Sequence, residues 1–176
     1  MEDQENVLLA PGAPFSPDGD AMAFRAALGA FATGVTVVTT DTPEGPVAIT
    51  ANSFASVSLD PPLVLWSPAK SSRRFEHFAH AQRFAIHILD ETQKSICDGF
   101  NRSKTAFDGL DWSTGPSGVP LIAGVAACFE CNLEARHDAG DHVILVGRVI
   151  RAHVTGGEPL IFHGGRYGAF AGLATG

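Results

Sequence analysis

The sequence predicts a mainly β protein, an antiparallel barrel with a few peripheral helices, and three observations support that prediction. Segments rich in β-branched residues are short and are joined by turn-forming residues, which is typical of hairpins. Helical spacing of apolar residues occurs only near the start of the chain and in one middle block. The regular alternation of strands and helices that indicates a parallel α/β sheet is missing.

The length of 176 residues favours one domain that is large enough to bury a substantial core. Residues 1–16 contain Pro11, Gly12 and Pro14 and show no periodicity. We therefore expect a flexible N-terminal arm over 1–16 and a single domain over 17–176.

The first predicted element is an amphipathic helix over about 18–31. Ser16 suits an N-cap and Pro17 the first helical position, and Gly34 follows the last apolar residue. The apolar face repeats at helical spacing along Met22, Phe24, Leu28 and Phe31.

The remaining elements follow from β-branched runs and from turn residues. A loop over 67–72 opens a helix that carries Phe75 and Phe78, and Asp90 caps a helix over about 91–100. Residues 101–120 are rich in glycine and proline and are expected to form a loop. Strands are expected over 35–40, 46–50, 63–66, 84–89, 125–136, 142–154, 159–163 and 166–170.

One polar stretch, residues 50–59, alternates in a way that predicts a half-buried strand continuing from the 46–50 segment. One face of this strand carries Thr50, Asn52, Phe54, Ser56 and Ser58. Such a face can hydrogen-bond a flat polar ligand. The simpler interpretation, that these groups decorate a solvated edge strand, stays open on the pattern alone.

The composition excludes several functional classes. A formal net charge of −7 argues against nucleic acid or an anionic membrane as the main partner. No apolar run approaches the roughly 20 residues of a membrane helix, and the acidic N-terminus does not resemble a signal peptide. Three cysteines do not form a disulfide framework, so we expect a cytoplasmic protein.

Two candidate metal or redox motifs are weak, and no metal site is predicted. Cys128 and Cys131 match the spacing C-x-x-C, but within a strand this spacing places the side chains on opposite faces, one buried and one outward. His77 and His80 can share a helix face, yet no third ligand has a matching position, so a solvated pair is expected.

Two further motifs have both a structural and a functional interpretation. Residues 70–73, Lys-Ser-Ser-Arg, open a predicted helix and can bind a phosphate, or they can form an ordinary solvated helix start. Gly140-Asp141-His142 follows a turn and needs no function to explain it. There is neither a G-x-S-x-G elbow nor a Gly-rich phosphate loop between a strand and a helix.

In their order along the chain, three segments resemble the short-chain flavin reductases, the reductase components of two-component flavin monooxygenases. These segments are residues 31–39 (FATGVTVVT), residues 49–64 (ITANSFASVSLDPPLV) and Gly140-Asp141-His142. The resemblance covers about residues 20–170. It implies an FMN-binding split barrel, an antiparallel Greek-key fold, which is usually a homodimer with flavin near the dimer interface.

The resemblance also implies roles for individual residues. The flavin ring and ribityl chain would lie against Thr50, Ala51, Asn52, Ser53 and Ser56, and the phosphate against Ser67, Ser71 and Ser72. Lys104 and Phe107 belong to a family segment near the flavin, and Tyr167 to a C-terminal segment bordering the same site. Gly140, Asp141 and His142 match the nicotinamide-nucleotide motif, and His142 is the first candidate for a catalytic residue.

The implied activity is hydride transfer from NADH or NADPH to FMN or FAD, with the reduced flavin supplied to a separate monooxygenase. Two alternatives stay open. One is a flavin-binding electron carrier without turnover. The other is an oxidase on a related barrel that acts on a phosphorylated small molecule such as pyridoxine phosphate. The Gly140-Asp141-His142 motif favours the reductase over both alternatives.

Overall fold

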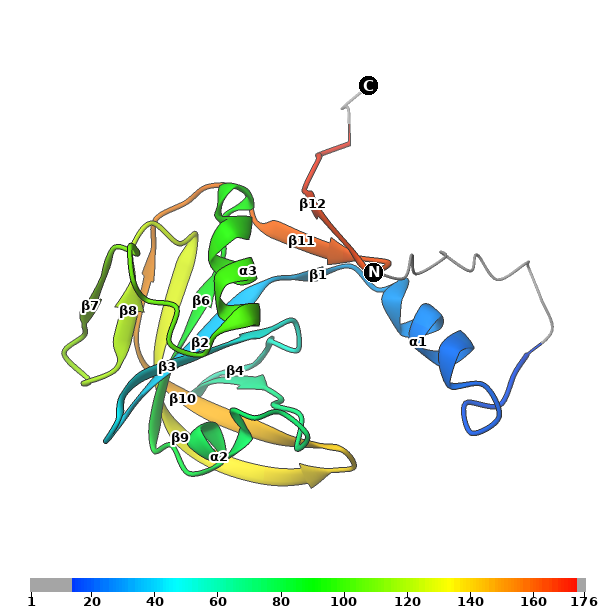
Figure 1. Ribbon diagram of the computed structural model, residues 1–176, viewed down its shortest axis with the longest axis horizontal. Coiled ribbons are helices and arrows are strands. Elements are labelled where there is room, and N and C mark those ends of the chain that lie inside the picture. The colour runs from blue at the N-terminus through cyan, green and yellow to red at the C-terminus, as the bar shows by residue number, and fades with distance from the viewer. Residues whose placement is uncertain (1–13, 174–176) are drawn as a thin grey trace.

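A computed structural model describes residues 14–173 and confirms the prediction of a mainly β, antiparallel protein (Figure 1). The helices are α1 (Ala21–Gly29), α2 (Phe75–Ala79), the 3-10 turn η1 (Glu91–Gln93) and α3 (Lys94–Arg102). The strands are β1 (Thr33–Gly34), β2 (Thr36–Thr42), β3 (Gly45–Ala51), β4 (Ala55–Leu59), β5 (Pro62–Trp66), β6 (Arg83–Ile88), β7 (Trp112–Thr114), β8 (Pro120–Ile122), β9 (Ala127–Ala139), β10 (His142–Val154), β11 (Leu160–His163) and β12 (Arg166–Ala169).

The main sheet has seven strands in the order β3-β2-β6-β9-β10-β5-β4, so two consecutive strands, β3 and β4, form its opposite edges. Seven flat strands would place these edges about 29 Å apart, whereas the chain from Ala51 to Ala55 spans at most about 14 Å. The sheet must therefore curl until its edges approach each other. Residues 52–54 are the short link across that gap.

Curling buries both faces of the central strands in two hydrophobic clusters. Val38, Ile86 and Cys131 point into a cluster that also contains Trp66 and Phe78. Side chains on the other face of the same strands, among them Val37, Ala85 and Cys128, form a second cluster beneath α3 and the β7–β8 hairpin. The β-branched run over 35–40 has no solvent-exposed face, because this part of the chain is covered on both sides.

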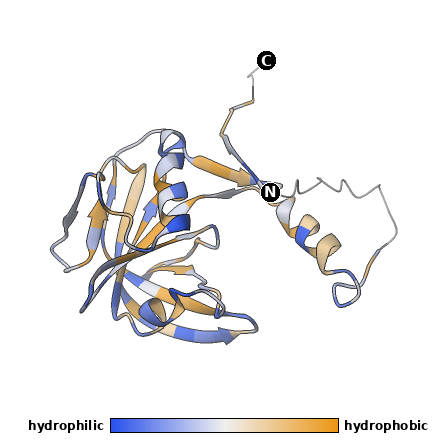
Figure 2. Ribbon diagram, in the orientation of Figure 1, coloured by the Kyte–Doolittle hydropathy of each residue, from blue (hydrophilic) through white to orange (hydrophobic). Residues whose placement is uncertain are grey.

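Two small sheets complete the structure. β7 and β8 form a hairpin, and β1 pairs with β11, which pairs with β12 through a turn at Gly164 and Gly165. The helix α1 precedes β1 in the chain. It stands apart from the barrel in Figure 1 and carries apolar residues along its length (Figure 2). No helix within residues 14–173 is long and apolar enough to cross a bilayer.

The boundaries of the N-terminal helix differ from the prediction. Residues 1–13 of the predicted arm lie outside the described residues. Ser16 and Pro17 form a turn rather than a helix start, since the Ser16 carbonyl accepts from the N–H of Gly19 and of Asp20. Asp20 is the actual N-cap, and its Oδ1 accepts from the N–H of Ala23 at 2.8 Å.

The prediction of one continuous polar strand over 50–59 was wrong. The strand breaks after Ala51 and resumes at Ala55 on the other edge of the sheet. Phe54 turns inward and stacks on Phe129, with ring centroids 5.7 Å apart. A bulge between Ser56 and Ser58 interrupts the alternation once more.

Two further predictions need correction. The predicted loop over 101–120 contains β7 and reaches the start of β8, strands of three residues each that are too short to show a period. Cys131 was expected to face outward, but it is buried like Cys128. The two thiols do lie on opposite faces of β9, and a hydrophobic cluster covers each face.

Candidate functional site

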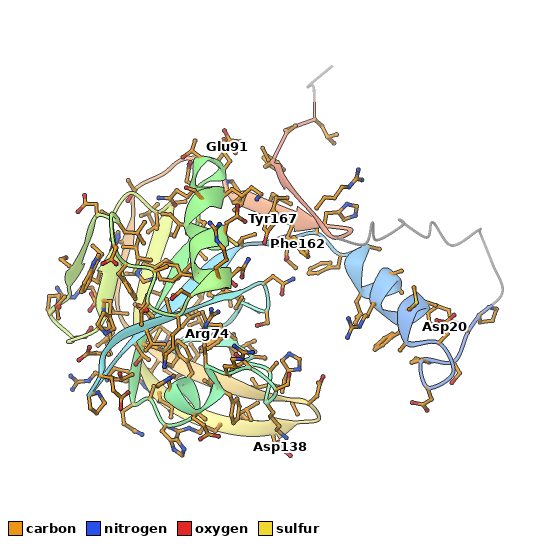
Figure 3. All side chains as sticks on the ribbon, viewed as in Figure 1. Asp20, Arg74, Glu91, Asp138, Phe162 and Tyr167 are labelled. Atoms are coloured by element: carbon orange, nitrogen blue, oxygen red, sulfur yellow. The ribbon has the colours of Figure 1, made fainter. Side chains whose placement is uncertain are left out.

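The break between β3 and β4 leaves a cavity of about 180 Å³ at the end of β3. Thr50, Ala51 and Asn52 form one wall, and Phe162 and Tyr167, from the β11–β12 hairpin, form another. Figure 3 shows Phe162 and Tyr167 next to α3, and their rings lie 5.2 Å apart. Val35 and Cys97 complete the lining, so predicted residues from both ends of the chain meet here.

A hydrogen-bonded network supports this cavity from the side of α3. The hydroxyl of Thr50 donates to Oδ1 of Asn101, whose amide nitrogen donates to Sγ of Cys97 at 3.6 Å. The Tyr167 hydroxyl lies 3.3 Å from the same sulfur. Burial, together with the contact to Cys97, raises the pKa of Tyr167 to about 12. The phenol therefore keeps its proton at neutral pH and is a fixed hydrogen-bonding group.

The link over residues 52–54 begins at Asn52 in the cavity wall and offers a row of backbone donors from there. Within residues 14–173, the N–H groups of Asn52, Ser53 and Phe54 donate no hydrogen bond to the protein. A flat ligand with carbonyl oxygens along one edge suits such a row of donors, and Val35 and Phe162 offer apolar surface beside it. The cavity holds only part of a flavin, because pockets for whole ligands of that size enclose about 300 Å³ or more.

Ser53 and Ser67 connect this rim to the loop that follows β5. The N–H of Ser67 donates to Oγ of Ser53 at 2.9 Å, and that hydroxyl lies 3.3 Å from the carbonyl oxygen of Ser67. Ser56 lies nearby in sequence on β4 and is exposed. Of the predicted phosphate ligands, Ser71 is exposed and Ser72 is half-buried, with its hydroxyl accepting from the N–H of Arg74.

The predicted helix start at residues 70–73 was wrong. These residues form turns, with the N–H of Ser72 donating to Ala69 and that of Phe75 to Ser72. The helix α2 begins at Phe75 and has only five residues. The N–H groups of Ser72, Arg74 and Phe75 are thus bound within the turn instead of pointing outward from a helix start.

Lys104 and Phe107 lie apart from the cavity lining. Lys104 is half-buried, with its Nζ 2.6 Å from Nε2 of His77. Phe107 is buried in the core between the rings of Phe100 and Trp112. His80 contacts Glu76 instead of sharing a ligand with His77. No cluster of three or more potential metal ligands occurs within residues 14–173.

Gly140 and Asp141 form the tight turn between the long strands β9 and β10, and His142 begins β10. Gly140 has a φ of +67°, a conformation that glycine adopts without strain. His142 Nδ1 donates to Oδ1 of Asp141 at 2.7 Å, which leaves Nε2 for a ligand. This hydrogen bond and the charge of His142 lower the pKa of Asp141.

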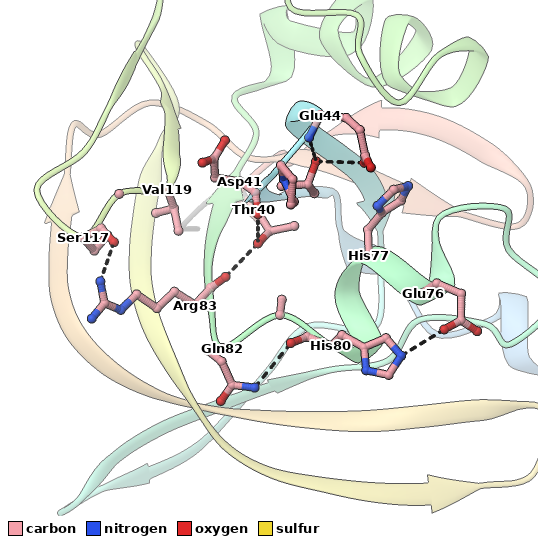
Figure 4. A pocket seen from close by; sticks show the side chains of 14 residues that line it. Thr40, Asp41, Glu44, Glu76, His77, His80, Gln82, Arg83, Ser117 and Val119 are labelled. Carbon is pink, nitrogen blue, oxygen red and sulfur yellow. Dashed lines mark hydrogen bonds and ion pairs between the residues drawn. The ribbon is translucent and has the colours of Figure 1, made fainter.

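A larger open groove, of about 650 Å³, lies elsewhere on the surface (Figure 4). It runs between the β2–β3 turn, α2 and the β7–β8 turn, and Glu44, Glu76 and His80 are among its residues. None of the predicted site residues lines it. Size alone therefore does not identify the functional site, whereas the smaller cavity collects Thr50, Ala51, Asn52 and Tyr167.

Sequence reasoning missed several residues that complete the site. Cys97 and Asn101 lie four residues apart on α3 and so share one helix face, a spacing that was available from the sequence. Val35 and Phe162 look like ordinary core residues in the sequence. No local signal distinguishes them, because the contact between β1 and β11 creates their position at the cavity.

Comparisons with known proteins agree on one family. The model described as "Flavin reductase like domain" matches residues 28–171. The FMN reductase (NADH) SmoA of Agrobacterium fabrum is 58% identical over 158 residues, which cover 89% of this chain and 91% of SmoA. HsaB of Rhodococcus jostii, the reductase subunit of a flavin-dependent monooxygenase, is 41% identical and is matched over 77% of its length by 84% of this chain.

Solved structures give the same result. The NADH:FAD oxidoreductase SgcE6 of Streptomyces globisporus superposes with a TM-score of 0.85 at 39% identity, over 95% of this chain and 97% of that one. A second structure of SgcE6, in complex with NAD and FAD fragments, matches with the same TM-score. The flavin reductase PheA2 matches with a TM-score of 0.80 at 34% identity, over 87% of this chain and 99% of PheA2.

Proposed function

The chain belongs to the flavin reductase-like domain family, and from that premise we propose that it is an NADH:flavin oxidoreductase that supplies reduced FMN or FAD to a separate monooxygenase. The main support is the cavity that joins Thr50, Ala51 and Asn52 to Tyr167, together with the N–H groups of residues 52–54, which donate to no other residue within 14–173. SmoA is named for NADH and FMN, and HsaB is named as the reductase subunit of a monooxygenase.

The protein's part in this reaction is binding, orientation and electrostatics. A bound flavin supplies the hydride-accepting ring, so no side chain needs to act as a nucleophile. The backbone donors of residues 52–54 would hold one edge of that ring and stabilise negative charge that develops there, while the hydroxyl of Thr50, bound to Asn101, fixes the adjoining wall. Tyr167, which lines the cavity and keeps its proton, would bound the space open to that ring.

On the nicotinamide side, His142 would hold the dinucleotide through Nε2. Asp141 fixes the orientation of the imidazole by accepting from Nδ1. When both substrates are bound in contact, their translational freedom is lost on binding and not in the chemical step. This lowers the activation free energy of hydride transfer by several kcal/mol. Ser56, Ser67, Ser71 and Ser72, with Lys104, remain candidates for the ribityl and phosphate groups. The buried ring of Phe107 would support that segment from within the core.

We further propose a homodimer built from residues 17–176 as one domain. Apolar side chains on α1 and just after it have little cover in the single chain: Met22 is 72% exposed, Leu28 59% and Phe31, two residues beyond the helix, 77%. An apolar stripe of this kind on a helix normally faces another surface. Replacement of Leu28 and Phe31 by aspartate should convert a dimer to a monomer in light-scattering measurements of mass. An unchanged mass would contradict the assignment of this surface.

A cytoplasmic location is also proposed, because NADH and reduced thiols are found there. Within residues 14–173 all three cysteines are free and buried, which suits a reducing compartment.

The direct test mixes the purified protein with NADH and FMN and follows absorbance at 340 nm. Loss of NADH that depends on both flavin and protein is the expected result. A protein that binds flavin tightly but leaves NADH unoxidised would instead be an electron carrier. Oxidation of a phosphorylated pyridoxine without NADH would support the related oxidase.

A further inference from the structure

The loop over residues 67–70 is attached at both of its ends to a proposed substrate site. At one end, Ser67 binds the hydroxyl of Ser53 beside the flavin segment, with its N–H 2.9 Å away. At the other end, the loop lies along the turn between β9 and β10, where Ala69 forms a β-bridge with His142. The N–H of Val143 adds a hydrogen bond to the carbonyl of Pro68 at 3.2 Å.

Lys70 makes the largest number of polar contacts to that turn. Its backbone N–H donates to the carbonyl of Asp141 at 2.8 Å. Its ammonium group donates to the carbonyl of Gly140 at 2.7 Å and also contacts the carboxylate of Asp138. Lys70 thus binds three residues of the hairpin tip, Asp138, Gly140 and Asp141, and Figure 3 locates this tip by the label of Asp138.

The turn has few other attachments to the rest of the protein. Side chains of Asp138 and Asp141 are 79% and 92% exposed, and Gly140 has no side chain. The Lys70 side chain, by contrast, is only 37% exposed. An exposed ion pair by itself contributes little, but a charged donor on a backbone carbonyl restricts the path of the turn itself.

We propose that Lys70 is a positioning residue for the reaction: it holds the Gly140–His142 turn at a fixed place relative to the flavin segment. The proposal rests on the proposed function. It differs from a phosphate-binding role for Lys70, since the backbone N–H and the ammonium group are already bound to the turn. Because Ser67 of the same loop binds Ser53, a change in the mobility of the Gly140–His142 turn can reach the flavin segment.

The kinetic consequence is specific. Without the ammonium group the turn samples more positions, so His142 is in place for a smaller fraction of the time and NADH binds more weakly. Flavin affinity should be left intact, because the Lys70 side chain binds Gly140 and Asp138 and none of the residues proposed to hold the flavin. Lys70→Met keeps most of the side-chain volume and should raise KM for NADH about fivefold, which corresponds to about 1 kcal/mol, the value of one ordinary hydrogen bond.

Rescue and control variants separate positioning from a general loss of structure. Lys70→Arg retains a cationic donor for the Gly140 carbonyl and should return KM to within about twofold of the original value. Arg148→Met removes another cation from the same hairpin, one that is bound to Glu134 rather than to the loop. It should leave KM for NADH unchanged.

Asp138 gives an additional test because it shares the Lys70 ammonium group. Asp138→Asn alone should raise KM slightly, and in the Lys70→Met background it should add nothing. Full additivity of the two effects would contradict a shared contact.

The decisive experiment compares the wild type, Lys70→Met, Lys70→Arg and Arg148→Met in three measurements: KM for NADH, dissociation constants for FMN and riboflavin, and hydrogen exchange over residues 137–146. Support requires a higher KM, unchanged flavin affinity and faster exchange for Lys70→Met alone. Weaker binding of FMN but not of riboflavin would make Lys70 a phosphate ligand and overturn the proposal. Unchanged exchange in Lys70→Met would also overturn it, even if the wild type lacked turnover and the proposed function itself had failed.

Discussion

Two histidines of the seven-stranded sheet, His87 on β6 and His142 on β10, show how differently the centre and the rim of this barrel are built. His87, one residue before the end of β6, is completely buried and uses both ring nitrogens. Nδ1 lies 3.0 Å from the Val37 carbonyl, and Nε2 accepts from the N–H of Ile122 at 3.1 Å. His142, at the start of β10, is 41% exposed and uses only Nδ1.

The number of hydrogen-bond partners distinguishes a histidine that stabilises the fold from one that can bind a ligand. His87 joins β6 to β2 on one side and to β8 on the other, so both of its polar atoms serve the fold. His142 is held by one neighbouring carboxylate and has a free nitrogen at the surface. A buried side chain with every polar atom satisfied has nothing left for a ligand. The following predictions test this division, beginning with the largest expected effect.

Replacement of His87 by alanine should destabilise the protein by about 3–5 kcal/mol, because it opens a cavity and leaves a buried carbonyl and a buried N–H unpaired. Urea unfolding followed by tryptophan fluorescence measures the change. His142→Ala is the matched control and should alter stability by less than about 0.5 kcal/mol. A similar loss for both variants would remove the distinction between the two histidines.

The same burial predicts a pH dependence of stability. Burial lowers the pKa of His87 from 6.5 to about 4, helped by the charge of nearby His153. The unfolded chain therefore binds a proton near pH 6.5, while the folded protein does so only near pH 4. Stability should fall as the pH drops through this window, by about 3 kcal/mol in total, and this group adds no slope above pH 6.5.

His87→Gln provides the control for that titration. Glutamine can make similar hydrogen bonds but does not titrate, so the slope of stability between pH 6.5 and pH 4 should become flatter. A slope as steep as that of the wild type would assign the acid sensitivity to other groups.

Replacement of His142 by alanine has its expected effect on kinetics. We expect KM for NADH to rise about tenfold, as the loss of one good hydrogen bond to a substrate predicts. Affinity for the flavin should be nearly unchanged, because residues 50–53 remain in place. Steady-state kinetics and fluorescence titration with FMN measure the two quantities. Unchanged NADH kinetics would exclude His142 from the site.

Much of the fold was predictable because the signals for it are local. The β-branched run over 35–40 and the turn at Gly164 and Gly165 predict a strand and a hairpin from a few neighbouring residues. The position of β3 and β4 at opposite edges of the sheet was not predictable. The alternation of polar and apolar residues indicates which face a side chain occupies, but not which strand lies next to it. The polar pattern continues across residues 52–54 as though the strand did not break.

The site was predicted in part for the same reason. Thr50, Asn52 and Ser53 belong to one segment whose chemistry is visible in the sequence. Thr50 and Asn52 share a cavity with Tyr167 because β11 pairs with β1, and the hydrogen bond from Thr50 to Asn101 depends on where α3 packs. Lys70 looked like a phosphate ligand because its neighbours are hydroxyl residues, whereas the docking of its loop on a distant turn gives it other partners.

Asp141→Asn gives the smallest and most specific effect, because it changes one charge at the rim and removes no side chain. The amide keeps an oxygen that can accept from His142 Nδ1, but a charge-assisted hydrogen bond is roughly twice as strong as a neutral one. Weaker orientation of the imidazole should raise KM for NADH about threefold, less than His142→Ala does. In the His142→Ala background the same substitution should have no further effect, since the group that Asp141 orients is gone. An effect of Asp141→Asn that persists without the imidazole would show that this carboxylate acts on the dinucleotide or on Lys70 directly.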